Sequence, residues 1–190
     1  MGELPPSDRR YREARLEALF RRHYRDVAVY VRRRAELDLV EDVVAETFLV
    51  AWRRLDEVPE NARPWLLGVA RKTLSTQRRS AARRHSLLTR LEAAESSVER
   101  TDQSSEFGVG EALMRLSEKD REAITLVAWE ELSPSEAALV VDQSPIAFRV
   151  RLHRAKRRLR ERLETQTAAP DSEPTLTPRE IPLTGGGPKL

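Results

Sequence analysis

The chain contains no cysteine, and this absence removes several classes of chemistry. Without a thiol the protein forms no disulfide, builds no thiolate zinc site and has no thiol nucleophile. A cysteine-free composition is compatible with a reducing compartment. We therefore expect an intracellular, cytoplasmic protein.

Long apolar runs are absent as well. No stretch approaches the roughly 20 apolar residues that a membrane-spanning helix needs. The first ten residues, MGELPPSDRR, lack the apolar core of a signal peptide. We expect no insertion into a membrane.

Groups for catalysis are also scarce. The chain has no glycine-rich phosphate loop and no serine nucleophile constellation. None of the three histidines, His23, His85 and His153, follows a carboxylate at the spacing used by di-metal helical bundles, so the acidic pair Asp42 and Glu46 does not indicate a metal site. We expect no enzyme, no metal and no cofactor, with His23 and His85 at the surface or half-buried.

Charge, by contrast, is abundant and unevenly placed. The 34 basic residues nearly balance 31 acidic ones, yet residues 145–162 carry eight cations and one acid. Apolar residues recur there at helical spacing, at Phe148, Leu152, Ala155, Leu159 and Leu163. The pattern predicts a helix with one stripe in the core and basic faces that suit a polyanion.

A shorter helix is predicted just before this basic helix. Ser133, Pro134 and Glu136 form a capping-box pattern, and Ser144-Pro145 begins the basic helix in a similar way. A third start is predicted at Ser117, whose side chain can accept from the amide of Asp120. Helix, tight turn and basic helix is the arrangement that reads the major groove of DNA.

The N-terminal half is also helical in its periodicity. Apolar spacing predicts helices over about 16–31 and 40–55 and a third from Pro64, which ends in the basic run 78–84. Periodicity weakens over 85–110, which we interpret as a flexible linker, and the tail 165–190 reads as disordered. The expected fold is all-α, with two small helical domains at 12–84 and 111–164.

Two separated segments resemble one family. The family is the sigma-70 initiation factors of bacterial RNA polymerase, specifically the extracytoplasmic-function (ECF) group. The first segment is similar to region 2 of these factors and comprises LVEDVVAETFLVAWRRLDEV and RPWLLGVARKTL. The second segment is similar to region 4 and reads ALMRLSEKDREAITLVAWEELSPSEAALVVDQSPIAFRVRLHRAKRRL. The resemblance implies a sigma factor that directs promoter-specific initiation by recognising the minus 35 and minus 10 elements and helping to open the promoter. Its implied partners are promoter DNA and the core polymerase, through the beta-prime clamp coiled coil and the beta flap. An anti-sigma factor is a further possible partner.

The resemblance assigns the helix with the ETF motif to core polymerase. Glu41, Asp42 and Glu46 are then expected to face outward, beside Phe48 and Trp52, toward the coiled coil. Without the resemblance, an ordinary solvated acidic face is the simpler interpretation.

For the minus 10 element, the resemblance points to the loop 55–63 and the helix that follows it. The loop is expected to capture a flipped base, with Asn61 reading its edge. The cationic side chains implied at this element, mainly through backbone phosphates, are Arg63, Arg71, Lys72, Arg78 and Arg79. The alternative for this helix is an ordinary basic surface.

For the minus 35 element, the resemblance places the start of the basic helix in the major groove. Arg149, Val150 and His153 occupy base-facing positions, and Arg151 and Arg154 are expected to bind phosphates. Farther along, the basic residues in 156–162 are either phosphate clamps or a solvated face.

The turn before the basic helix departs from a common family pattern. Asp142 stands where many members have glycine, and aspartate tolerates the left-handed backbone conformation better than most residues. We therefore expect the turn to be kept.

A second function remains open at this point. A stand-alone helix-turn-helix regulator that does not bind core polymerase would use the same Arg149 helix. It leaves the acidic helix and Trp52 without a role in nucleic-acid binding.

Overall fold

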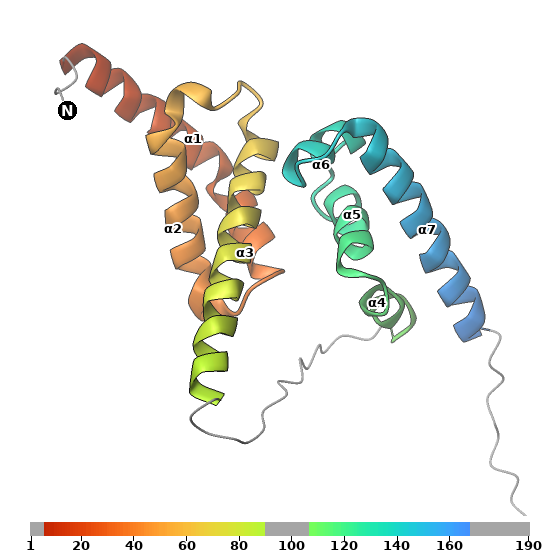
Figure 1. Cartoon of the computed structure of the whole chain (residues 1–190). Coiled ribbons are helices and arrows are strands. Elements are labelled where there is room, and N and C mark those ends of the chain that lie inside the picture. The colour runs from red at the N-terminus through yellow and green to blue at the C-terminus, as the bar shows by residue number, and fades with distance from the viewer. Residues whose placement is uncertain (1–5, 90–106, 168–190) are drawn as a thin grey trace, which may run out of the picture.

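The computed structural model describes residues 6–89 and 107–167, and these fold entirely as helices and short connections (Figure 1). No β-strand occurs within those two ranges, so the all-α expectation is confirmed. Most of the predicted linker, and the tail from residue 168 onward, lie outside the described residues.

The first domain is a bundle of three long helices. They are α1 (Pro6–Arg32), α2 (Leu37–Arg53) and α3 (Ala62–Thr89), with a short 3-10 turn, η1 (Leu55–Glu57), between the second and third. Their apolar faces meet in a core that contains Val27, Tyr30, Val31, Val43, Val44, Phe48, Leu66, Leu67 and Leu74. The three helices were predicted from periodicity, because each carries apolar residues at the spacing of one helix face.

The end of α3 differs from the prediction. The basic run 78–84 was expected to terminate the helix, but α3 continues through it to Thr89. Arginine and alanine are strong helix formers, and the run contains neither glycine nor proline. A cluster of charge does not stop a helix when no residue breaks its backbone.

The second domain consists of α4 (Phe107–Met114), α5 (Glu118–Ala128), α6 (Pro134–Val140) and α7 (Pro145–Thr167). The predicted caps are present. The Ser117 hydroxyl accepts from the amide of Asp120 at 3.2 Å, and the Ser144 hydroxyl accepts from the amide of Ala147 at 3.2 Å. Ser133 and Glu136 form the full capping box at the start of α6. Local sequence therefore fixes three helix starts in this domain.

Among the described residues, two that are not glycine have a left-handed backbone. Asp142 has φ of 56°, so the turn between α6 and α7 is kept as expected. Glu131, in the connection between α5 and α6, has φ of 53°, which no sequence pattern had indicated. Both positions are turns in which the chain must reverse direction within a few residues.

The two domains pack against each other, with α6 lying against α3 (Figure 1). Their backbones approach closely at Gly68, where a Cβ added to the glycine would lie 3.6 Å from the Cα of Val140. Buried residues of both domains form one continuous apolar cluster. The sequence predicted two small helical domains joined by a flexible linker and gave no indication of this contact.

Candidate nucleic-acid interface

The helix-turn-helix is formed by α6, the turn at 141–144 and α7. Phe148, Leu152 and Ala155 are buried beneath α7, which confirms the predicted apolar stripe. Since these residues hold one face of α7 inward, the residues between them face solvent. The local pattern of the sequence thus determines which side chains are presented.

The presented face contains the residues expected at the minus 35 element. Arg149, Val150, His153 and Arg154 are exposed and Arg151 is half-buried. Within the described part of the chain, none of these side chains has a hydrogen-bond or ion-pair partner. Cations without protein partners are available to phosphates or base edges, which keeps this face chemically suited to DNA.

Two apolar side chains on this side of the domain were not predicted to be exposed. Ile146 is 73% exposed and Leu139 is 68% exposed. Ile146 lies outside the stripe of Phe148, Leu152 and Ala155, and Leu139 lies between the buried Ala138 and Val140, so both side chains point away from the core. Ile146 adds apolar surface at the start of the basic helix α7.

Farther along α7 the basic residues divide into two kinds. Arg158 is ion-paired with Asp120 of α5, and Arg157 lies 3.4 Å from Glu161 one turn away. Lys156, Arg160 and Arg162 are exposed. These three residues are therefore the ones that either bind DNA phosphates or form a solvated face, whereas Arg158 is engaged within the domain.

The loop expected to capture a base borders a cavity of about 320 Å³. Its lining residues are Arg22, His23, Glu60, Asn61 and Ala62. Asn61 thus lies at a hollow, as a base-reading amide requires. Arg22 and His23 were not predicted at this site, because they come from α1, far from the loop in sequence.

His23 was expected at or near the surface and is buried instead, at 7% exposure. Its Nδ1 lies 3.6 Å from an oxygen of Asp26 and makes no hydrogen bond to a described residue. Burial lowers the pKa of His23 below 6.5, against the opposing effect of Asp26. The imidazole lines the cavity, and its burial disfavours the protonated form.

All the side chains expected at the minus 10 element except Arg79 bond to the second domain. Arg71 forms two hydrogen bonds to Glu122, at 2.6 and 3.0 Å, and Asn61 donates to Glu136 at 2.9 Å. The remaining contacts of this set are Arg63 to the Glu130 carbonyl at 2.8 Å, Lys72 to Asp142 at 3.4 Å and Arg78 to Glu118 at 3.4 Å. Arg79 donates to Thr76 of its own helix. The structure brings these residues together at the start of α3 and along it; Arg63 and Arg71 are half-buried, and the other four are exposed.

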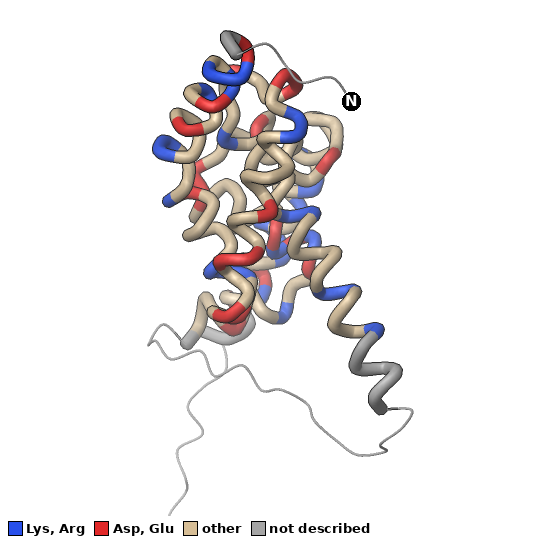
Figure 2. The backbone as a smooth tube through the Cα atoms, turned by 90° about the vertical axis from the view of Figure 1, so that its left-hand side faces the viewer, with Lys and Arg blue, Asp and Glu red and all other residues tan. Residues whose placement is uncertain are grey.

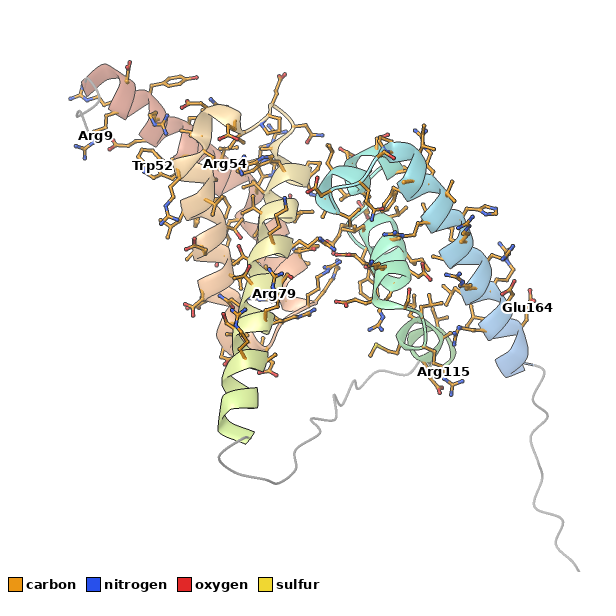
Figure 3. The ribbon with its side chains drawn as sticks, in the orientation of Figure 1. Arg9, Trp52, Arg54, Arg79, Arg115 and Glu164 are labelled. Carbon is orange, nitrogen blue, oxygen red and sulfur yellow. The ribbon has the colours of Figure 1, made fainter. Side chains whose placement is uncertain are left out.

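The acidic face of α2 partly matches its prediction. Glu41 and Asp42 are exposed, and Glu46 is half-exposed and lies 3.4 Å from Arg53. Trp52 is half-buried under Arg12, on the side of the bundle away from the second domain (Figure 3).

The outward placement of Phe48 is wrong. This ring is 5% exposed and packs on Phe20 with ring centroids 4.8 Å apart. Its position on the helix points into the bundle core. Leu49, which follows it, is 47% exposed and supplies apolar surface on the outer side instead.

Charge on the first domain is mixed, in contrast to the basic face of α7. Basic and acidic positions are interleaved along the tube in the view of Figure 2. In the ranges that the structure describes, no cluster of histidine, aspartate and glutamate is arranged to hold a metal ion. None of the described helices is both long and apolar enough to cross a membrane.

Comparisons with known proteins identify both domains. Residues 19–84 match the family model described as Sigma-70 region 2, and residues 108–159 match the model described as Sigma-70, region 4. The chain is 30% identical over 131 residues to the RNA polymerase sigma factor NccH of Alcaligenes xylosoxydans xylosoxydans, covering 63% of this chain and 70% of that protein.

Solved structures give the same result. CnrH in complex with the cytosolic domain of CnrY is 28% identical, with a TM-score of 0.54 over 79% of this chain and 88% of that chain. The sigma factor RpoE in complex with the anti-sigma factor NepR from Bartonella quintana is 25% identical, with a TM-score of 0.51 over 84% of this chain and 98% of that chain. Sigma factors are transcription initiation factors, which act with RNA polymerase at promoter DNA and are not enzymes. On its two matched regions and its helical fold, the chain belongs to the sigma-70 family of RNA polymerase sigma factors, in the ECF group.

Proposed function

We propose that this sigma factor selects promoters through two separate contacts, one with duplex DNA and one with an opened strand. The observation that carries the proposal is the free basic face of α7. Arg149, Val150 and His153 are exposed at the start of the second helix of a helix-turn-helix, where side chains reach base edges. The second domain therefore reads the minus 35 element.

The first domain takes the minus 10 element. Its support is the cavity beside Asn61, which offers a place for a base that has left the stack. A row of cations, Arg71, Lys72, Arg78 and Arg79, follows on α3 and suits the phosphates of the same strand. A protein that opens DNA without ATP compensates for lost stacking through such contacts.

Core polymerase holds the two contacts at the correct distance. The outer face of α2, with Glu41, Asp42 and Glu46 beside Leu49 and Trp52, offers charge and apolar surface for the basic coiled coil of the beta-prime clamp. The second domain binds the beta flap. An anti-sigma factor is a further partner, as in the RpoE and NepR complex.

The proposal assigns region 2 to residues 12–84 and region 4 to residues 111–164, with a linker at 85–110 and a tail at 165–190. The family matches support this division. Because region 2 is present, the alternative of a stand-alone regulator loses its basis. A factor that serves RNA polymerase works in the cytoplasm.

Reconstituted transcription tests the proposal. The full chain is added to core RNA polymerase with a library of genomic start sites, and the transcripts are sequenced. We expect initiation at a subset of sites that share two upstream elements. No initiation at any site, or tight binding to duplex operators without association with core polymerase, would refute it.

A further inference from the structure

We propose that Arg12 and Arg15 of α1 are positioning residues for the minus 10 element: they hold the connection between α2 and α3 in the shape that places Asn61 at its cavity. This inference rests on the proposed function, because it concerns the loop that is proposed there to capture a base. The match to region 2 begins at residue 19, so both arginines lie before the matched residues. They act through the loop and not by contact with DNA.

The first half of α1 lies at the end of the bundle where α2 is connected to α3 (Figure 1). Arg12 and Arg15 are half-buried there, whereas Glu13 and Ala14 between them are exposed. Residues three apart lie on the same side of a helix. Both guanidinium groups therefore reach the same connection.

Arg12 binds the beginning of the connection with two nitrogens. Its Nη2 donates to the carbonyl of Trp52 at 3.1 Å, and its Nη1 donates to the Asp56 carboxylate at 2.7 Å. Trp52 lies in the last turn of α2, where carbonyls have no partner within the helix. Asp56 belongs to the short turn η1. One side chain thus fixes the end of α2 relative to η1.

Arg15 binds the connection farther along. Its Nη2 donates to the carbonyl of Val58 at 2.9 Å. The Val58 side chain is 4% exposed and packs in the core. Val58 is therefore held twice, by the packing of its side chain and by the hydrogen bond to its carbonyl. A residue held in both ways sets the direction in which the backbone continues toward Asn61.

The same face of α1 continues to the cavity. Arg22 lies about two helical turns after Arg15, and His23 lies about three turns after Arg12. Both Arg22 and His23 line the cavity together with Asn61. A single stripe of α1 therefore follows the connection from the end of α2 to the base-reading amide.

The far end of the connection is held by the same helix. Asp26 of α1 accepts from the Nε of Arg63 at 3.1 Å, at the start of α3. Asn61 itself is exposed, between Val58 and Arg63, which both bond to α1. A loop that is held in its binding conformation loses less conformational freedom when a ligand arrives.

A fixed loop matters for selectivity. Bases are distinguished by hydrogen bonds to their edges, so the reading amide must keep one position. If the contacts of Arg12 and Arg15 are lost, the loop can adjust and Asn61 can bond to more than one base. The two arginines should therefore affect the choice of base more than the amount of transcription.

The test uses holoenzyme reconstituted from full-length chains, with enough sigma factor to saturate core polymerase. The templates are a promoter that wild-type holoenzyme uses and versions with single bases of the minus 10 or minus 35 element replaced. The readout is the ratio of initiation on the native and the replaced template. Because a smaller amount of folded protein lowers initiation on both templates alike, this ratio separates positioning from a loss of stability.

The main variant, Arg12→Ala with Arg15→Ala, removes the three hydrogen bonds to the connection. Its matched control, Arg9→Ala with Arg10→Ala, removes two exposed arginines of the same helix and changes net charge equally. A further variant, Arg15→Lys, keeps a cation that can donate to the single carbonyl of Val58.

We expect the ratio at the most selective minus 10 position to fall about tenfold in the main variant, with the minus 35 ratio unchanged. The control pair should keep both ratios, and Arg15→Lys should keep more of the minus 10 ratio than Arg15→Ala. An unchanged minus 10 ratio in the main variant overturns the inference, as does an equal fall at both elements or in the control pair. Equal ratios for Arg15→Lys and Arg15→Ala overturn it for Arg15.

Wild-type holoenzyme separates this inference from the proposed function. If wild type initiates and selects a minus 10 base, and the main variant selects it equally well, only the positioning role is wrong. If wild type initiates at no site, or tolerates every replacement in the minus 10 element, the proposed function fails and this inference fails with it.

Discussion

Arg158 of α7 is ion-paired with Asp120 of α5, a carboxylate that is only 6% exposed. Asp120 lies in the first turn of α5, and Arg158 reaches it from the middle of α7. The pair joins the two helices on either side of α6. An arginine in a run of cations is therefore a structural residue, and its loss should affect stability before it affects DNA.

Replacing Arg158 with alanine should destabilise the second domain. The change leaves the buried Asp120 carboxylate without its cation, which costs about 1–3 kcal/mol in the free energy of unfolding. The matched control is Arg157→Ala, since Arg157 pairs with Glu161 at the surface and such pairs contribute little. Urea unfolding followed by circular dichroism measures both. Equal midpoints for the two variants would contradict the structural role of Arg158.

Replacing Arg149 with alanine should remove discrimination at the minus 35 element. Arg149 is exposed and free to make a bidentate contact with guanine, worth about 1–3 kcal/mol between the right and the wrong base. Transcription by holoenzyme from a native and a scrambled minus 35 element measures the ratio. Arg154→Ala is the control and should weaken both templates alike, because a phosphate contact carries no sequence information. An equal loss on both templates for Arg149→Ala would exclude base reading.

Reversing the charge of the α2 face should weaken binding to core polymerase. Glu41→Lys with Asp42→Lys places two cations where a basic coiled coil is expected, and like charges repel across an interface. We expect the affinity for core polymerase, measured by fluorescence anisotropy, to fall at least about tenfold. Glu13→Lys with Glu17→Lys makes the same change of charge on α1 and should have little effect. Unchanged affinity in the α2 variant would place the polymerase contact elsewhere.

His23 should make the fold sensitive to acid. Its folded pKa lies below the ordinary value of 6.5, so the unfolded chain binds the proton first as the pH falls. The free energy of unfolding should therefore fall as pH drops through 6.5 toward the lowered value. In His23→Gln this part of the decline should be absent. Urea unfolding above and below pH 6.5 measures it, and an identical decline in both proteins would show that the imidazole does not contribute.

The sequence indicated the helices and their starts because these depend on nearby residues. Ser133, Pro134 and Glu136 specify the beginning of α6 through contacts within one turn of helix. The stripe of Phe148, Leu152 and Ala155 likewise settled which face of α7 is buried. The predicted helix start and the predicted buried stripe together indicated that Arg149 is exposed.

Other features depend on segments that are distant in sequence. Phe48 keeps the helical spacing of Val44 and Ala51, whereas the resemblance assigned it outward; its burial against Phe20 of α1 shows that it packs in the bundle. The cavity near Asn61 needs Arg22 and His23 from α1, which no spacing rule connects to the loop. These associations leave no signal in the sequence.

By itself, then, the sequence determined the all-α class, the helix starts, the basic reading helix and the absence of thiol chemistry. The tertiary structure decided how the acids and bases are paired. Arg71 appears in the sequence as one of many free cations, whereas in the structure it is held by Glu122, 51 residues away. The reason is physical: caps and apolar stripes act within a few residues, while ion pairs between domains depend on packing that brings distant charges together.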